Sequence, residues 1–128
     1  MYKRQEYGQA REEYLGALDL RPGDAEATNN LSWAAIFSGE GINEALARME
    51  SVVSAPGGRR PALLDTLGVL RMRANRPGEA EEAFALAEAL CRQAGAAPRV
   101  GLKEEEACPE EAQREIEAHR RELRGRFP

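Results

Sequence analysis

The sequence predicts an all-α fold, in which six helices form antiparallel hairpins that stack side by side as an α-solenoid. Three observations support this prediction. Apolar residues recur at helical spacing in six segments, and turns rich in glycine, proline or asparagine separate most of these segments. Small and large side chains also recur in register, 35 residues apart along the chain. A single hairpin cannot bury both of its faces, so the repeat implies stacking.

The clearest hairpin spans residues 62–90 and turns at residues 75–78. Gly68 in its first helix and Ala80 and Ala87 in its second are small, which predicts that the two helices approach closely there. Both helices carry an i, i+3/i+4 apolar stripe. The stripes comprise Leu63, Leu64, Leu67, Leu70 and Ala74, then Ala80, Ala83, Phe84, Ala87, Leu90 and Cys91.

The repeat has the form small-x3-large-x2-small on the second helix of each hairpin. The first helix matches twice, because Leu31-Ser32 corresponds to Leu67-Gly68. This pattern, with a period of about 34 residues, resembles the tetratricopeptide repeat. Ser32 in place of glycine and Met49 in place of an aromatic residue depart from that pattern. The three registered sets are Ala10, Ala45 and Ala80; Tyr14, Met49 and Phe84; and Ala17, Val52 and Ala87.

The resemblance implies about two and a half repeats between residue 2 and about residue 90. The first helix of the first repeat is missing from the chain, so we expect a truncated start and an exposed apolar edge there. The implied segments are a partial repeat at 1–23, full repeats at 24–58 and 59–94, a linker at 95–108 and a C-terminal capping helix at 109–128.

Local signals set the expected bounds of the first three helices. Pro22 ends the first, Asp24 is placed to cap the second, and Glu26 in the first turn suits the helix dipole. Gly39 and Gly41 form the next turn. The three segments are 3–20, 25–38 and 42–54.

The remaining helices follow a loop at residues 55–61 that holds two prolines and two glycines. Pro61 and Pro109 suit first-turn positions. The last helix carries a narrow apolar stripe with charged residues around it, as a cap requires. We expect it to pack on the helix at 79–94; the alternative is that it leaves the domain to pair with a partner. Its stripe comprises Ala112, Ile116, His119 and Leu123.

Composition narrows the possible functions. The net charge of −4 argues against a nucleic-acid binder, and no stretch reaches the length of a membrane helix. The N-terminal residues are polar and charged, so we expect no secretory signal and a cytoplasmic protein. Cys91 and Cys108 lack metal-ligand spacing. We expect Cys91 to be a small core residue and Cys108 a free loop thiol, a disulfide between them being the less favoured alternative.

Catalytic groups are scarce. His119 is the one histidine, so every nucleophile–histidine set would depend on it, and we expect it to be a half-buried packing residue. Gly57-Gly58 has neither a following lysine nor a preceding strand, so it does not form a phosphate loop. The sequence therefore predicts no enzyme activity, no cofactor and no metal site.

Binding is the better expectation. In the family that the chain resembles, first helices line a concave groove that binds peptides. Trp33 either faces this groove or packs on the neighbouring repeat, and Asp65 either lines it or supports the start of its helix. Arg73 either contacts an acidic peptide or is solvated at the groove edge. The expected groove residues are Glu26, Asn29, Asn30, Trp33, Phe37, Asp65, Val69, Met72 and Arg73.

The predicted function is a protein–protein interaction module that binds a peptide or a partner protein in this groove. An alternative is a structural or self-associating segment of a larger protein, with copies meeting at the exposed N-terminal edge. Fold resemblance alone does not name the partner.

Overall fold

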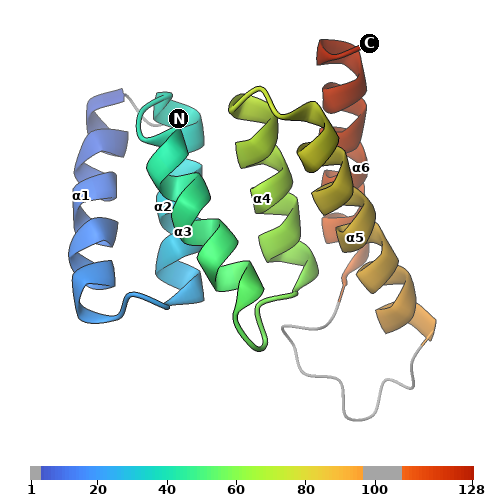
Figure 1. Ribbon diagram of the computed structural model, residues 1–128, viewed down its shortest axis with the longest axis horizontal. Coiled ribbons are helices and arrows are strands. Elements are labelled where there is room, and N and C mark those ends of the chain that lie inside the picture. The colour runs from blue at the N-terminus through green and yellow to red at the C-terminus, as the bar shows by residue number, and fades with distance from the viewer. Residues whose placement is uncertain (1–3, 97–107) are drawn as a thin grey trace.

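The computed structural model describes residues 4–96 and 108–128, and within them the chain forms six α-helices and no strand (Figure 1). The predicted all-α class is therefore confirmed. Of the predicted linker at 95–108, residues 97–107 lie outside the described part. The helices are α1 (Arg4–Leu20), α2 (Ala25–Ser38), α3 (Ile42–Ser54), α4 (Pro61–Arg73), α5 (Pro77–Ala96) and α6 (Glu110–Arg126).

The helix ends follow the local signals in the sequence. The Asp24 carboxylate accepts a hydrogen bond from the backbone N–H of Ala27 at 3.0 Å, so Asp24 caps α2 as predicted. Gly39 ends α2 in the left-handed conformation, with φ 77°. Pro61 is the first residue of α4. Asn75, in the turn between α4 and α5, also has a positive φ of 61°, which asparagine tolerates well.

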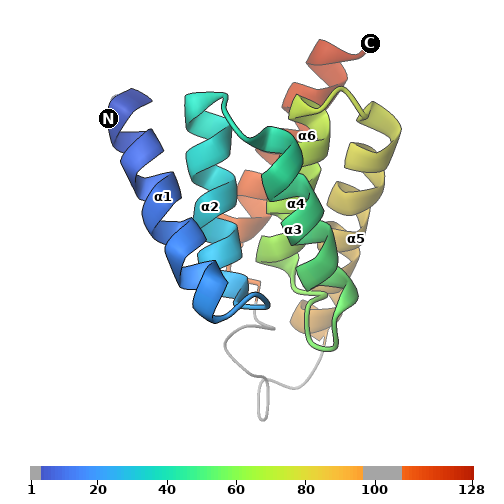
Figure 2. The same cartoon turned by 60° about the vertical axis from the view of Figure 1, so that its left-hand side comes forward.

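The helices pack in two layers (Figures 1 and 2). Each helix contacts the next along the chain, and α2 also contacts α4, which in turn contacts α6. The even-numbered helices thus form one continuous layer, and α1, α3 and α5 cover it from the other side. α6 packs on both α5 and α4, so the last helix joins the even-numbered layer and does not leave the domain.

Helices α4 and α5 approach each other closely at Gly68 on α4. A Cβ atom built there would lie 2.4 Å from Cε1 of Phe84 on α5, far inside van der Waals contact. Phe84, Ala80 and Ala87 are fully buried. The prediction that small residues let α4 and α5 approach closely is therefore confirmed at Gly68, because only a residue without a side chain leaves room for the Phe84 ring.

The two cysteines correct the expectation of a free thiol. Cys91 in α5 and Cys108, just before α6, form a disulfide across a sequence separation of 17. Cys91 is buried in the core as expected, but it is also one half of this covalent link. The bond ties the start of α6 to α5 and limits how far α6 can move away.

Candidate functional site

The candidate site lies on the face formed by the even-numbered helices. A small cavity of about 130 Å³ opens where α2, α4 and α6 meet. It combines an indole ring, an amide, a hydroxyl and two carboxylates, so it offers both apolar and polar contacts. The lining residues are Asn29, Trp33, Ala62, Asp65, Thr66, Ala112, Glu115 and Ile116.

Trp33 was expected either to face the groove or to pack on the neighbouring repeat, and the structure shows a part of each. Its ring lies 5.9 Å from the His119 ring of α6 and 5.7 Å from the Phe37 ring on its own helix, measured between centroids. The side chain is nevertheless partly exposed and lines the cavity. Trp33 therefore packs against a neighbouring helix and still presents an edge to the open face.

Phe37 is the most exposed residue of an aromatic row on this face. Its side chain is 61% exposed, and its ring stacks on Tyr7 of α1 at 5.4 Å. Trp33 lies on its other side, followed by His119, whose ring lies 6.2 Å from Phe84. An exposed aromatic ring held between two others is a rigid apolar surface, which suits contact with another protein.

The predicted asparagines take different roles. Asn29 accepts a hydrogen bond from the hydroxyl of Thr66 on α4 through its side-chain oxygen, at 2.7 Å, and this bond joins α2 to α4 beside the cavity. Its side-chain NH₂ group has no partner among the described residues, and Asn29 is one of the residues that line the cavity. Asn30 is partly buried and does not line the cavity. Asn29 is thus the one of the two that the structure places at this site.

Asp65 lines the cavity but does not cap its helix. It is buried, and Nδ1 of His119 lies 2.9 Å from its Oδ1. The hydrogen bond from Asp65 raises the pKa of His119 above its usual 6.5, against the opposing effect of burial. His119 is half-buried as expected, but its role goes beyond packing, because it is the polar link between α6 and α4.

Val69 and Met72 correct the predicted groove. Both are buried, at 2% and 1% exposure, so neither can contact a partner directly. The position of α6 accounts for this: it packs along α4, and His119 bonds to Asp65, which lies on the same helix face as Val69 and Met72. The repeat register predicted which face of α4 points inward but not how far the last helix would cover it.

The charged positions are spread over a wider area than predicted. Arg73 is exposed at the C-terminal end of α4, outside the cavity. Glu26 is exposed about one turn before Asn29 on α2, and Glu115 of α6 is an exposed carboxylate in the cavity lining. Neither glutamate has an ion-pair partner within the described part of the chain. The surroundings of the cavity are therefore acidic.

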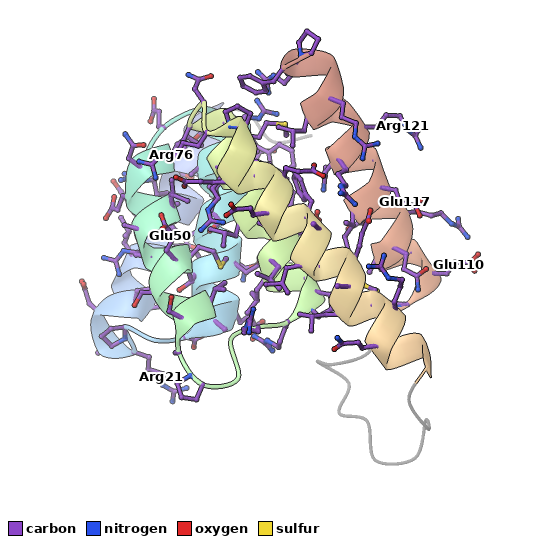
Figure 3. The ribbon with its side chains drawn as sticks, turned by 45° about the vertical axis from the view of Figure 1, so that its right-hand side comes forward. Arg21, Glu50, Arg76, Glu110, Glu117 and Arg121 are labelled. Atoms are coloured by element: carbon purple, nitrogen blue, oxygen red, sulfur yellow. A yellow bond between two sulfur atoms is a disulfide. The ribbon has the colours of Figure 1, made fainter. Side chains whose placement is uncertain are left out.

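Glu115, Ala112 and Thr66 were missed as site residues. The amphipathic stripe of α6 indicated which of its residues face the protein, and Ala112 belongs to that stripe. Nothing local indicated that α6 would border the cavity beside Trp33. Its outward face carries Glu110, Glu117 and Arg121, which point away from the other helices (Figure 3).

A second polar contact holds α6 on α5. Arg120 donates from Nε to a carboxylate oxygen of Glu81 at 2.9 Å and from Nη1 to Glu88. The hydrogen bond to Arg120 lowers the pKa of Glu81, and the Glu81 bond in turn raises the pKa of Arg120. With the Asp65–His119 bond and the disulfide, this ion-pair network fixes the helix that borders the cavity.

The described residues hold no cluster of histidine, cysteine or carboxylate side chains that could bind a metal ion, and none of their helices is long and apolar enough to cross a membrane. Comparison of the chain with protein-family models, curated proteins and solved structures finds no match.

Proposed function

We propose that this chain is a protein–protein interaction module of the tetratricopeptide-repeat type, which binds a peptide segment of a partner on the face of α2, α4 and α6. The observation that carries the proposal is the pair formed by Phe37 and Trp33, one exposed and one partly exposed, beside a cavity with free polar groups. Aromatic residues that are accessible and held rigidly are frequent anchors of binding interfaces.

The chemistry of the face suggests the kind of peptide. The carboxylates of Glu26 and Glu115 have no ion-pair partner among the described residues, and the amide of Asn29 has a free donor. A peptide with one apolar side chain against Trp33 and Phe37, flanked by lysine or arginine, would complement these groups. The amide of Asn29 would bond the peptide backbone.

The test begins with peptides selected from a random library displayed on phage, using the purified chain as bait. Synthetic copies are then titrated against the protein while the fluorescence of Trp33, its one tryptophan, is recorded. We expect the emission to shift on binding, and the selected peptides to be enriched in basic residues around an apolar one. A Phe37→Ala variant should bind about tenfold or more weakly.

Leu20→Ala is the matched control. Leu20 is the other large exposed apolar residue of the described chain, at 85% exposure, and it lies at the end of α1. Selected peptides that bind wild type, Phe37→Ala and Leu20→Ala equally would contradict the proposal. A concentration-dependent dimer in sedimentation that Phe37→Ala abolishes would replace it with self-association through the same face.

A further inference from the structure

A larger cavity lies on the other side of α4 and is not part of the proposed peptide face. It measures about 740 Å³ and is enclosed by the C-terminal end of α3, the loop that follows it, α4 and α5. Leu64, Leu67 and Arg71 of α4 line it. At 3.6 residues per turn these three positions lie on the face of the helix opposite to Asp65 and Thr66. The two cavities are therefore separated by α4 itself.

The cavity combines apolar walls with cationic groups. Val53 and Leu86 supply its accessible apolar surface, with the buried Leu64 and Leu67 behind them, and apolar walls are common in sites for organic ligands. Arg59, Arg60 and Arg71 also line it, against a single carboxylate, Glu82. The chain as a whole has a net charge of −4, so this local excess of arginine is opposite in sign to the rest of the protein.

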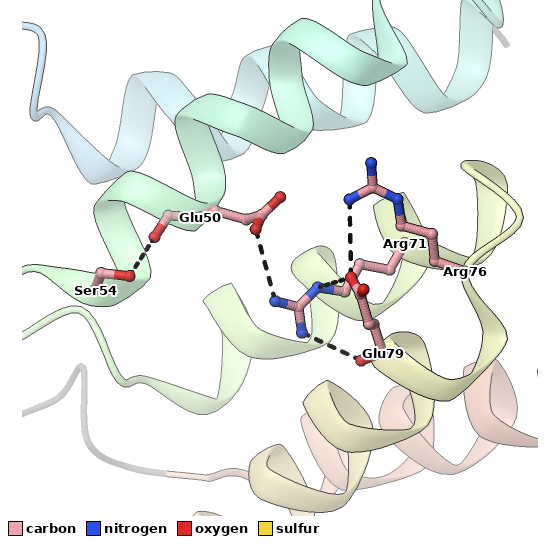
Figure 4. Close-up of polar contacts among 5 residues, drawn as sticks. All are labelled: Glu50, Ser54, Arg71, Arg76 and Glu79. Atoms are coloured by element: carbon pink, nitrogen blue, oxygen red, sulfur yellow. Dashed lines mark hydrogen bonds and ion pairs between the residues drawn. The ribbon is translucent and has the colours of Figure 1, made fainter.

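Arg71 is fixed in place but only partly satisfied (Figure 4). Its Nη1 donates to the backbone carbonyl of Glu79 at 3.1 Å, and its other nitrogens lie 3.9 Å from carboxylate oxygens of Glu50 and Glu79. Those two separations exceed hydrogen-bond length, and its buried Nε has no hydrogen-bond partner. Arg71 is thus a positioned cation with unused donor capacity.

The positive charges of Arg59 and Arg60 have even fewer partners than that of Arg71. Neither has a carboxylate within ion-pair distance among the described residues, and the buried Nε of Arg60 lacks a hydrogen-bond partner. Buried donors in folded proteins are nearly always paired, so an orphaned arginine nitrogen beside an open cavity needs an explanation. An anionic ligand in the cavity supplies one.

We propose that this cavity binds an acidic peptide segment of a partner protein that carries a leucine-sized apolar side chain next to its carboxylates. The apolar side chain packs over Val53 and Leu86, the partly exposed apolar residues of the lining, and the carboxylates bind Arg59 and Arg60 at the loop end. Leu64 and Arg71 are seven positions apart, about 10 Å along the helix axis, which is the length of about three extended residues. This site is independent of the peptide face around Trp33 and selects the opposite ligand charge.

Fluorescence anisotropy with a defined probe tests the proposal. The probe is a fluorescein-labelled peptide, Asp-Glu-Leu-Leu-Glu-Asp, compared with a neutral peptide, Asn-Gln-Leu-Leu-Gln-Asn, and with an acidic peptide that has serine at both leucine positions. We expect the first probe to bind at least about tenfold more tightly than either control. Equal binding of the neutral peptide would show that the arginines do not contribute to binding. Equal binding of the serine peptide would show that the apolar residues of the cavity do not contribute.

Charge reversal locates the site. Arg59 is an exposed residue of the loop, so Arg59→Glu should preserve the fold and weaken binding of the first probe by about tenfold or more. Arg121→Glu is the matched control, because Arg121 is exposed on α6, away from the cavity, and the change in net charge is the same. Equal loss in both variants would mean that only the net charge of the protein matters and would overturn the proposal.

A second variant tests the apolar wall, and a third separates the two sites. Leu86→Asn should weaken the first probe while thermal unfolding shows that the variant is folded. Phe37→Ala should leave this probe unaffected, so failure of the peptide face around Trp33 and failure of this cavity give different results. Absence of any anisotropy change with wild type at about 1 mM protein would overturn the inference.

Discussion

Asp65 and His119 hold α6 against α4 through a single polar contact, in which Nδ1 of His119 lies 2.9 Å and 3.0 Å from the two carboxylate oxygens. The imidazole also lies between the rings of Trp33 and Phe84. His119, whose ring contacts Trp33 of the candidate peptide site, is therefore both packed against aromatic rings and hydrogen-bonded to Asp65. Its protonation should be coupled to the stability of the C-terminal helix.

The first prediction follows from the raised pKa of His119. A histidine whose pKa is higher in the folded than in the unfolded state stabilises the fold fully below its unfolded value of about 6.5, and this contribution is lost as pH rises through the folded pKa. We therefore expect the contribution of His119 to the unfolding free energy to be larger at about pH 6 than at about pH 8.5. Urea denaturation of wild type and His119→Gln at both values measures it.

Nuclear magnetic resonance gives a direct control, because His119 is the one histidine of the chain. Its ring signal should titrate above 6.5 in wild type and return toward that value in Asp65→Asn, since the first cause of the shift is the Asp65 hydrogen bond. Glu115 and Glu122 also face the ring electrostatically and should retain a smaller effect. A signal that titrates at the same pH in both proteins would contradict the assignment.

The second prediction concerns Arg120. Its guanidinium bridges Glu81 and Glu88 of α5, and its side chain is only 20% exposed. Arg120→Ala should lower the unfolding free energy by about 1–2 kcal/mol, because it leaves two carboxylates close together without their cation. Arg114→Ala is the control. Arg114 pairs with Glu110 within one exposed helix turn, a contact worth about 0.5 kcal/mol or less. Equal effects in urea denaturation would mean that the network adds no more than a surface pair.

The third prediction concerns the disulfide between Cys91 and Cys108. A link that closes a loop of this size stabilises a fold by about 3 kcal/mol, chiefly by restricting the unfolded chain. Reduction should lower the melting temperature and alter the fluorescence of Trp33, whose ring contacts α6 at His119. Disulfides persist mainly in oxidising compartments, and the cytoplasmic location expected from the sequence stays a prediction.

The double variant Cys91→Ser, Cys108→Ser is the control for reduction. It should melt close to the reduced wild type, apart from the effect of a serine at the buried position 91, and should not respond to reductant. A melting temperature of wild type that is the same with and without reductant would show that the bond contributes nothing to stability.

Much of the fold was readable because the signals that set it are local. Asp24 and Pro61 mark helix starts within a few residues of their own position, and the registered small residues identified the hairpin that contains Gly68. The contacts that build the site join distant parts of the chain. The Asp65–His119 bond spans 54 residues, and no local pattern in either helix indicates it.

The errors have the same origin. Val69 has the right register for an inward-facing residue, but it is buried in α4, against which α6 packs. From the sequence, Cys108 is expected to be a free thiol in a loop. No local pattern shows that the fold brings it next to Cys91. Sequence periodicity fixes which face of a helix is apolar, but the partner that covers this face depends on tertiary packing.

The last prediction tests the close packing of α4 on α5. Gly68→Ala would place a Cβ atom 2.4–2.7 Å from three carbons of the Phe84 ring, which is itself fully buried and cannot swing aside. We expect a loss of about 1–3 kcal/mol in unfolding free energy from this overpacking, even though alanine is the better helix former.

Gly16→Ala is the matched control, because Gly16 lies inside α1 with no atom within 4 Å of the added group. There the same substitution should stabilise by about 0.5–1 kcal/mol. Adding Phe84→Leu to Gly68→Ala should recover part of the loss, because the smaller side chain leaves room for the new methyl group. If both glycine variants are stabilised in urea denaturation, the two helices do not approach as closely as the structure places them.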